Sequence, residues 1–433
     1  MTDDLNLVQF VRSPAAMQAA PILVLLPVPG APLDAAGAAW SQDADPRVLG
    51  LGLVRRAVLA ARRAGYGRVF LLTEDGAETA GAAATPDWSG LAATFRSSRT
   101  TPMLIAPASI LAETEWLERL AEAEIEAACW TAIPNRIAMI AAAAALDAFV
   151  ALGAEGGARD LAAAEGRLAR RFGSPATIPA GIDPMLVESS ADVPAAERRL
   201  LRALVKDTDG FMARLVERPI SLQISRRLAS TAITPNQMSL ISIVVGVSAG
   251  PFFLSPLPFW QTIGALLFLA HSILDGCDGE LARLKFQESR WGGILDFWGD
   301  NVVHSVIFAS MAAGWSLSAG AAWPLMLGVA AVLGGLGSAS FVYWRLMRVK
   351  LDSGPLFTSV STAPDQRLAR LLDGASRRDF IYLVLALALF GKSNWFLLLA
   401  AVGAPIYLFL VIFLAARERG LKTIRAQGGS RLD

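Results

Sequence analysis

The chain has 433 residues, of which 54% are hydrophobic and 18% are charged, and its 39 basic and 38 acidic residues nearly cancel. This length predicts two domains, and the near-neutral charge argues against a nucleic-acid-binding protein. Cys129 and Cys277 are its two cysteines, which excludes a disulfide framework and a cysteine-rich zinc module. The stretch "MTDDLNLVQFVRSPAAMQAA" has early acids and no apolar core typical of a secretory signal, so we expect the N-terminal part to stay unexported.

Within an expected domain of residues 1–200, apolar runs and helical patterns alternate over residues 21–180. The segments "PILVLLPVP", "GRVFLLTE" and "TPMLIAP" are typical of buried strands. Between the first two, "DPRVLGLGLVRRAVLAARRAG" has helical spacing and ends in glycine. This alternation predicts an α/β domain of Rossmann type, with a parallel sheet in a three-layer arrangement.

The composition changes near residue 235, where six long apolar runs begin. Most of them approach the roughly 20 residues that a membrane-spanning helix needs. We therefore expect an all-α membrane domain of six transmembrane helices over residues 236–416, followed by a basic tail over 417–433.

The sequence of the linker, residues 201–235, predicts an amphipathic helix on the membrane surface. Its apolar residues would face lipid or the bundle and its arginines the headgroups: Ile220, Leu222, Ile224, Leu228, Arg226 and Arg227.

Basic residues alternate between the expected connections of these helices. The connections after the second and fourth spans and the C-terminal tail are basic, whereas the others carry almost no charge. The positive-inside rule then predicts a multi-pass inner-membrane protein whose N-terminal domain, active site and C-terminus face the cytoplasm. Arg345 and Arg378 belong to the long basic connection. Binding of an acceptor phosphate and simple membrane anchoring explain these two arginines equally well.

The segment "LDGCDGELARLKFQESRWGGILDFWGD", residues 274–300, places four aspartates between apolar helices. Each charged group at membrane depth costs roughly 2.5–3.5 kcal/mol even on lenient scales, so we expect a compensating cation. Helical spacing puts Asp275 and Asp278 on one face and Asp296 and Asp300 on another. Hard oxygen donors suit Mg²⁺, Mn²⁺ or Ca²⁺ rather than zinc or copper. The alternative, acidic caps or a solvated loop, is disfavoured because small residues that admit a ligand share these faces: Gly279, Ala282 and Gly292.

Residues 275–300 match the pattern D-x-x-D-G-x-x-A-R-x(8)-G-x-x-x-D-x-x-x-D without a departure. In this the chain resembles the CDP-alcohol phosphotransferases, six-span membrane enzymes that move a substituted phosphate from a CDP-linked donor to an acceptor hydroxyl and release CMP. The resemblance implies two Mg²⁺ or Mn²⁺ ions. Asp275 and Asp296 would bridge both ions and Asp278 would complete one site. Asp300 would touch the second ion and act as the catalytic base.

The same resemblance implies a donor site. It places Arg283 at the phosphates or nucleotide, two glycines close to the cytidine, and two polar residues of "ITPNQMSLIS" at the nucleotide or diphosphate. The expected donor-binding residues are Asn236, Ser239, Gly279, Ala282, Arg283, Ser289 and Gly292. Thr234 and Pro235 suit the start of a helix, so capping remains an alternative for Asn236 and Ser239. Membrane anchoring is the alternative for Arg283.

The two histidines lie one helical turn from an aspartate, His271 before Asp275 and His304 after Asp300. They would line the floor of the polar cavity that the resemblance implies, and they would orient an aspartate or the acceptor. Packing inside the bundle is the alternative for both.

The N-terminal domain resembles sugar-phosphate nucleotidyltransferases, but two positions depart from that family. The segment after the first strand, "VPGAPLDAAGAAW", has no basic residue for a triphosphate, and "MLIAPASI" has no metal-binding aspartate. We therefore expect this domain to have lost catalysis. The segment "LVKDTDGFMARLVERPISLQISRRLASTAITPNQ" looks like the joint of bifunctional enzymes that make inositol-phosphodiester products.

Several hypotheses stay open at this point. The donor is a soluble CDP-polyol such as CDP-inositol, which the joint favours, or the lipid-linked CDP-diacylglycerol with a polar acceptor. A bifunctional enzyme would also make the CDP-alcohol from CTP, and a scaffold would use no chemistry, although four membrane-depth acids argue against that. The family implies contacts with membrane lipids and a homodimer, for which "GVAAVLGGLGSAS" offers small residues.

Overall fold

The computed structural model describes residues 20–26, 46–72, 83–85, 88, 91, 102–122, 130–133, 137–141, 144–154, 158, 161–173, 184–205, 210–349 and 380–429. The chain divides into two compact units, Met1–Arg202 and Ala203–Asp433. Residues 1–19, in which no secretory signal is expected, lie outside the described residues, as do Cys129, Arg378 and the segment without basic residues after the first strand.

The first unit contains a six-stranded sheet with the order β5-β4-β1-β6-β9-β8. Its strands are β1 (Ile22–Leu26), β4 (Arg68–Leu72), β5 (Ala83–Thr85), β6 (Met103–Pro107), β8 (Trp130–Ile133) and β9 (Ile137–Ile140). The three strands expected from the sequence are confirmed as β1, β4 and β6. Ile22 of β1 pairs in parallel with both Arg68 and Met103. Every residue of β1 is buried, as a central parallel strand covered on both faces requires.

The sheet is mixed, so the prediction of a wholly parallel sheet is wrong. Strand β9 runs antiparallel to both β6 and β8. Only three residues separate Ile133 from Ile137. A parallel return would need a crossover of a dozen or more residues, so this short connection forces an antiparallel pair.

The helix expected between the first two long strands is shorter than predicted. Its first part forms a hairpin of β2 (Arg47–Val48) and β3 (Leu51–Gly52), and α2 (Leu53–Arg63) starts only after it. Leu49 and Gly50 make the turn with φ values of 52° and 77°. Two-residue hairpins of this kind need positive φ at both positions, which helical spacing alone does not reveal.

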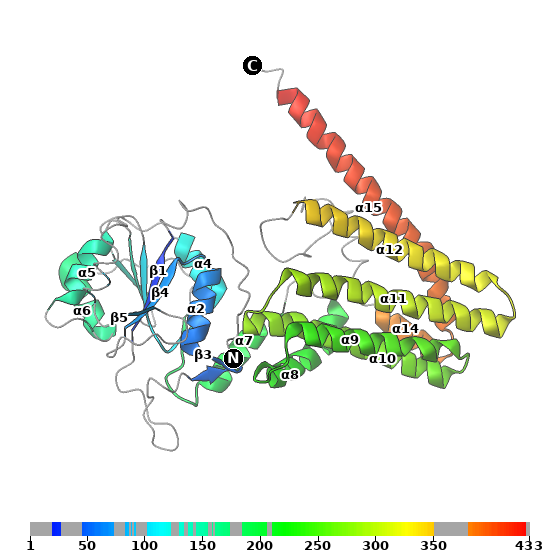
Figure 1. The fold of residues 1–433 in the computed structure, drawn as a ribbon, viewed down its shortest axis with the longest axis horizontal. Helices are drawn as coiled ribbons and strands as arrows, with labels where there is room; N and C mark the ends of the chain where they lie inside the picture. The colour runs from blue at the N-terminus through cyan, green and yellow to red at the C-terminus, as the bar shows by residue number, and fades with distance from the viewer. Residues whose placement is uncertain are drawn as a thin grey trace, which may run out of the picture. The chain divides into compact units, whose positions relative to one another are not determined.

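Helices cover both faces of the large sheet. Figure 1 shows α2 and α4 (Thr114–Glu122) on one face and α5 (Ala145–Gly153) and α6 (Leu161–Phe172) on the other, which confirms three layers. Val24 and Ile105 of the sheet belong to one buried cluster with Phe149 and Leu168 of these helices. The unit also contains β7 (Ile110–Leu111), which pairs with β10 (Met185–Leu186), and α7 (Val193–Ala203).

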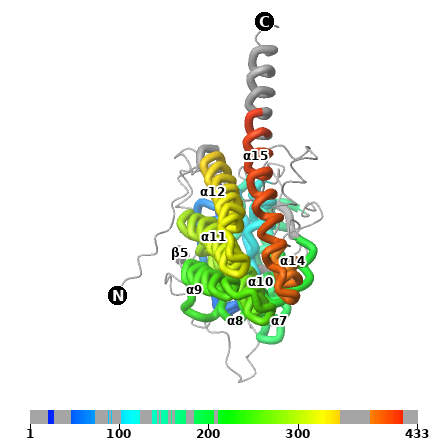
Figure 2. The backbone as a smooth tube through the Cα atoms, turned by 90° about the vertical axis from the view of Figure 1, so that its right-hand side faces the viewer, coloured from blue at the N-terminus to red at the C-terminus, as the bar shows by residue number. Residues whose placement is uncertain are grey.

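The second unit is helical. Its elements are η2 (Ala213–Glu217), α8 (Arg218–Ala229), α9 (Pro235–Ala249), η3 (Gly250–Leu254), α10 (Pro258–Lys285), α11 (Arg290–Ala319), α12 (Trp323–Val349), α14 (Phe380–Leu389) and α15 (Ser393–Gly429). Helix α9 packs against α10 and α11, and α10 also contacts α8 and α14. Helix α11 packs on α12, which lies beside α15 (Figure 2).

Within the described residues, four segments are long and apolar enough to cross a membrane: Pro235–Leu254, Arg290–Ala319, Trp323–Arg345 and Ser393–Phe413. The other two expected spans correspond to α10, whose last turns carry acids, and to the short apolar helix α14. The structure therefore has a helical membrane unit with four candidate spans. Six spans remain a prediction.

Small residues of α12 pack within the chain. A Cβ on Gly334 would lie 2.7 Å from the backbone nitrogen of Pro405, and one on Gly337 would lie 2.9 Å from Leu408 Cδ2. Only Gly335 of this stretch has open space around it. The stretch expected to support a dimer thus packs largely against α15, and the homodimer remains a prediction.

Candidate active site

Helix α9 starts with a reciprocal cap. Thr234 Oγ1 accepts a hydrogen bond from Gln237 N at 3.3 Å, and Gln237 Oε1 accepts one from Thr234 N at 2.9 Å. Pro235 occupies the first helical position, where its missing N–H costs nothing. The predicted start of this helix is confirmed, and it fixes the direction in which Asn236 and Ser239 project.

A short connection joins α10 to α11. Phe286 ends α10 with a left-handed φ of 56°, and the Oγ of Ser289 caps α11 by accepting a hydrogen bond from Gly292 N at 3.0 Å. Lys285 Nζ donates to the carbonyls of Thr231 and Ile233 at 2.8 and 2.7 Å, which ties this end of α10 to the connection before α9. The tight turn brings the acidic faces of α10 and α11 together.

Three of the four predicted metal ligands form one group. Asp275, Asp278 and Asp296 each offer a carboxylate oxygen, and these atoms lie within 4.8 Å of one another. Asp275 and Asp278 are only 5% and 6% exposed. Carboxylates this close repel one another, and burial raises the cost of their charge. The donor set is all hard oxygen, with Asp275 and Asp278 buried and Asp296 partly exposed, and it fits a divalent cation such as Mg²⁺ or Mn²⁺.

Ser239 holds one member of this group. Its buried Oγ donates a hydrogen bond to Asp278 Oδ2. A hydroxyl that donates to a carboxylate restricts the rotation of that carboxylate and lowers the cost of its charge. The sequence predicted a nucleotide contact for Ser239, and the structure brings it to an acid of the cluster.

Asp300, the fourth aspartate, lies beside His271. Nε2 of His271 is 3.3 Å from Asp300 Oδ1, and Nδ1 of the same ring lies 2.9 Å from the carbonyl oxygen of Ser242. A carbonyl can only accept, so Nδ1 donates to it and the ring is fixed in orientation. His271 is 2% exposed, and a Cβ on Gly246 would lie 2.8 Å from its ring. The predicted proximity of His271 to an aspartate is thus observed, although that aspartate is Asp300.

His304 has different surroundings. Its ring packs edge-on against Phe268 and Phe380 at centroid distances of 5.5 and 5.6 Å. Phe308 lies 6.4 Å away in a stacked arrangement. These contacts correspond to the packing alternative for His304.

Four of the expected donor-site residues lie in two close pairs. Asn236 Oδ1 would lie 2.9 Å from a Cβ on Gly292, so the amide sits over the glycine backbone. Arg283 Nη1 would lie 3.4 Å from a Cβ on Gly279, so the guanidinium folds back over this glycine. Ala282 follows on the same helix and accepts a hydrogen bond from Gln287 N at 2.9 Å. Arg345 lies in α12, half-buried.

Two buried acids next to this site were not predicted. Glu280 is fully buried on α10, two residues after Asp278, and Glu217 is 7% exposed at the end of η2. Glu280 falls at a variable position of the aspartate motif, so the motif gives no signal for it. A signal exists on the partner segment, where Glu217, Ser221 and Ser225 recur at helical spacing and are all buried.

The sequence matches agree with this geometry. Residues 232–361 match the model of the CDP-alcohol phosphatidyltransferase family. This range contains the cap of α9 and all four aspartates. The helical unit contains a CDP-alcohol phosphatidyltransferase domain.

Relatives of this transferase domain include two enzymes named bifunctional IPC transferase and DIPP synthase. The protein of Archaeoglobus fulgidus is 40% identical over 131 residues, which cover 30% of this chain and 25% of that protein. The protein of Aquifex aeolicus is 27% identical over 255 residues, which cover 58% of this chain and 55% of that protein. This second match is longer than the helical unit, so it reaches into the first unit. The chain thus spans a quarter to about half of the length of these relatives.

A solved structure of Mycobacterium tuberculosis phosphatidylinositol phosphate synthase with CDP-DAG bound is also similar. It is 21% identical, covers 45% of this chain and 94% of that one, and has a TM-score of 0.31. Likeness at this level supports no conclusion about this chain.

Proposed function

We propose that this protein is a CDP-alcohol phosphotransferase that moves a substituted phosphate from a CDP-linked donor to an acceptor hydroxyl. The observation that carries the proposal is the group of Asp275, Asp278 and Asp296, whose oxygens lie within 4.8 Å of one another. Buried like charges are expensive, so a scaffold would have no reason to keep them.

The aspartates would hold two divalent ions, Mg²⁺ or Mn²⁺. Asp275, Asp278 and Asp296 would hold them, together with Asp300, each through its carboxylate oxygens. When bound, such ions neutralise the charge of a diphosphate and stabilise the departing oxygen.

The remaining residues act on the donor and acceptor. Arg283 would bind the donor phosphates, and Asn236 would bind the nucleotide above Gly292. The acceptor oxygen forms a bond to the phosphorus that carries the alcohol, the bond from that phosphorus to CMP breaks, and CMP leaves with the electron pair. Asp300 would take the hydroxyl proton, and His271 would donate from Nε2 to that carboxylate when its ring carries both protons.

The donor is, in our proposal, a soluble CDP-polyol of the CDP-inositol type and the acceptor an alcohol. The similarity to two enzymes named bifunctional IPC transferase and DIPP synthase supports this choice. CDP-diacylglycerol with a polar acceptor is the second candidate, supported by the same domain match. The enzyme would work as a six-span inner-membrane homodimer with its site and both termini in the cytoplasm, surrounded by lipid.

The first unit is proposed to be a nucleotidyltransferase-like domain without catalysis. The bifunctional relatives support the alternative, in which the same chain also makes the CDP-alcohol from CTP and an alcohol phosphate. These alternatives give different products, because cytidylyl transfer releases pyrophosphate and phosphoalcohol transfer releases CMP.

The deciding experiment measures CMP and pyrophosphate release by the purified full chain in detergent with Mg²⁺ or Mn²⁺. Donors are CDP-inositol, CDP-glycerol and CDP-diacylglycerol, each with soluble and lipid alcohols, and CTP is tested with alcohol phosphates. We expect CMP release from a soluble donor, lost in Asp300→Asn. Pyrophosphate release that survives in Asp300→Asn would establish the bifunctional alternative. A folded protein that releases no CMP from any donor would contradict the proposal.

A further inference from the structure

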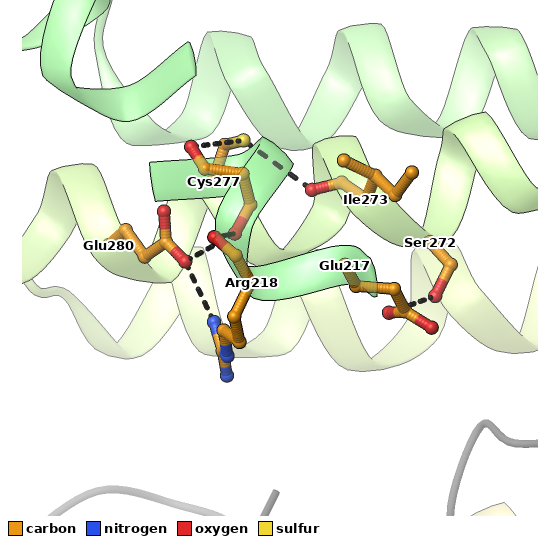
Figure 3. A network of polar contacts seen from close by, with 7 residues as sticks. Glu217, Arg218, Ser272, Ile273, Cys277 and Glu280 are labelled. Carbon is orange, nitrogen blue, oxygen red and sulfur yellow. Dashed lines mark hydrogen bonds and ion pairs between the residues drawn. The ribbon is translucent and has the colours of Figure 1, made fainter. Parts of the chain in front are cut away.

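A line of buried polar contacts joins the segment before α9 to the helix that carries the first two aspartates (Figure 3). We call this group the clamp, and it consists of Glu217, Arg218, Ser221, Ser272, Glu280 and Tyr382. Residues 217–221 belong to η2 and α8, Ser272 and Glu280 belong to α10, and Tyr382 belongs to α14. The clamp therefore connects three helical segments of the second unit.

The first half of the clamp is centred on Glu280. Its Oε1 accepts hydrogen bonds from Arg218 Nη1 at 2.8 Å and from Ser221 Oγ at 2.7 Å. The side chain of Glu280 is 0% exposed and that of Arg218 is 17% exposed. Cys277, between Glu280 and Ile273 on the same helix, points its Sγ to the carbonyl of Ser221 at 3.6 Å. Helix α8 thus meets α10 through directional polar contacts.

The second half is centred on Glu217 of η2, which contacts α10 at Ser272, about two helical turns before Glu280. Glu217 Oε2 accepts from Ser272 Oγ at 3.0 Å, and Glu217 Oε1 accepts from Tyr382 Oη at 3.2 Å. One carboxylate thus links η2 to both α10 and α14. The two halves of the clamp contact α10 on either side of Asp275 and Asp278 in the sequence.

Stability alone does not explain this arrangement. A buried ion pair usually contributes no more than apolar residues of the same volume, because desolvation offsets the attraction. Apolar faces, however, let helices slide and rotate, whereas a buried carboxylate with two fixed donors accepts one register. The expected apolar face of α8 is in fact partly exposed, since Ile220 is 43% exposed, while Ser221 and Ser225 are buried.

We propose that Glu217 and Glu280 are positioning residues that set the register and rotation of α10, and thereby the places of Asp275 and Asp278 in the cation site. The inference rests on the cation site of the proposed function. The hydrogen bonds of Glu217 and Glu280 join them to Arg218, Ser221, Ser272 and Tyr382, and the inference assigns the segment before α9 a part in building the site.

The test is Mn²⁺ binding by the purified full chain in detergent. Binding is measured as the decrease in the electron paramagnetic resonance signal of free Mn²⁺. The variant pair Glu280→Gln with Arg218→Met keeps the net charge and removes the ion pair. We expect its Mn²⁺ affinity to fall about 3- to 10-fold, less than the 10- to 100-fold loss typical when a group bonded directly to a ligand is removed. Unchanged affinity in a folded double variant would overturn the inference.

The single variant Arg218→Met distinguishes positioning from electrostatics by the direction in which Mn²⁺ affinity changes. Loss of a nearby positive charge should strengthen cation binding if charge is all that matters. Positioning predicts weaker binding, with partial recovery in Arg218→Lys. Stronger binding in Arg218→Met would contradict the inference. If Arg218→Met does not fold, Ser221→Ala with Ser272→Ala removes only hydroxyl donors, and we expect an affinity loss of about 2- to 3-fold.

Gln261→Leu is the matched control. Gln261 is a buried polar residue at the other end of α10, where Nε2 donates to the Ser255 carbonyl at 3.1 Å and Oε1 accepts from Ser393 N at 3.3 Å. Its loss should lower thermal stability and leave Mn²⁺ affinity unchanged. An equal loss of affinity in the control would overturn the inference, since any damage to α10 would then suffice. A wild-type chain that binds Mn²⁺ but releases no CMP would remove the proposed function and leave this test intact.

Discussion

Glycines bring helices together at two places in the transferase domain, with different results. Where α9, α10 and α11 meet, Gly246 lies against Val303 and His271 and Gly292 lies against Asn236, so close approach brings polar groups together beside apolar contacts. Where α12 meets α15, Gly334 lies against Pro405, and the approach yields only backbone and apolar contact. The same residue type thus builds a reaction site in one place and a packed seam in the other.

The comparison implies that the two regions respond differently to substitution. Changes among α9, α10 and α11 should lower activity more than stability, because the carboxylates there oppose folding. Changes between α12 and α15 should lower stability more than activity.

The largest effect is expected for Asp275→Asn. Loss of a proposed metal ligand removes several kcal/mol of transition-state stabilisation, which corresponds to about 10³-fold or more in rate. The thermal stability of the metal-free protein should stay equal or rise, since one of three clustered carboxylates is gone. CMP release and thermal unfolding in EDTA measure the two effects. A less stable metal-free variant with normal activity would break the comparison.

Asp300→Asn should lower the rate about 10²- to 10³-fold by removing the base that accepts the hydroxyl proton. Mn²⁺ affinity should change less than in Asp275→Asn, because Asp300 lies beside His271 rather than within the three-acid group. Single-turnover CMP release and Mn²⁺ titration check this. Equal loss of Mn²⁺ affinity in both variants would assign Asp300 to metal binding alone.

Ser239→Ala should cost about 10-fold in activity. The variant removes the hydroxyl that donates to Asp278, and loss of a group bonded to a metal ligand typically costs 10- to 100-fold. The effect should appear as a higher Mg²⁺ concentration for half-maximal rate. Ser248→Ala is the matched control, because the Oγ of Ser248 is exposed and donates to the Val245 carbonyl of its own helix.

Gly292→Ala should raise the KM for the donor about 3- to 10-fold, an effect of about 1 kcal/mol. The new methyl group would meet Asn236 Oδ1 at 2.9 Å, and that flexible side chain can move away without unfolding the helix. Donor titration and thermal unfolding separate the two consequences. A large loss of stability with normal KM would show that this glycine serves packing.

Gly334→Ala, in contrast, should lower the free energy of unfolding by about 1–3 kcal/mol, as overpacking commonly does. Its methyl group would meet the backbone nitrogen of Pro405 at 2.7 Å, and a backbone cannot give way as a side chain can. Gly335→Ala, next to it in open space, is the control and should behave as wild type. Activity per folded molecule should be unchanged in both.

Local patterns made part of this structure predictable from the sequence. The strands β1, β4 and β6 are continuous apolar runs, and the aspartates recur at helical spacing. Neighbouring residues alone therefore predict these strands and the acidic helix faces. The start of α9 was equally readable from the neighbours Thr234 and Pro235, although the part that Gln237 plays in the cap was not predicted.

Features set by distant partners could not be read in the same way. The antiparallel direction of β9 depends on which strand it joins, and the hairpin before α2 depends on φ values at Leu49 and Gly50. The pairing of Ser239 with Asp278 and of Glu217 with Tyr382 joins residues far apart in the chain. Sequence spacing predicts which residues share one face of a helix or strand, but it does not predict which other helix or strand that face packs against.

Lys285 shows that one residue can act at two times in the life of a membrane protein. In the proposed orientation, in which this connection faces the cytoplasm, its charge would favour that side of the bilayer during insertion, as the positive-inside rule expects. Once the chain has folded, the same ammonium lies between the carbonyls of Thr231 and Ile233 at 2.8 and 2.7 Å. An arginine would preserve the first role, but its planar fork suits a carboxylate or phosphate better than two converging carbonyls. Biogenesis and the finished fold therefore select this position by different criteria, and lysine satisfies both.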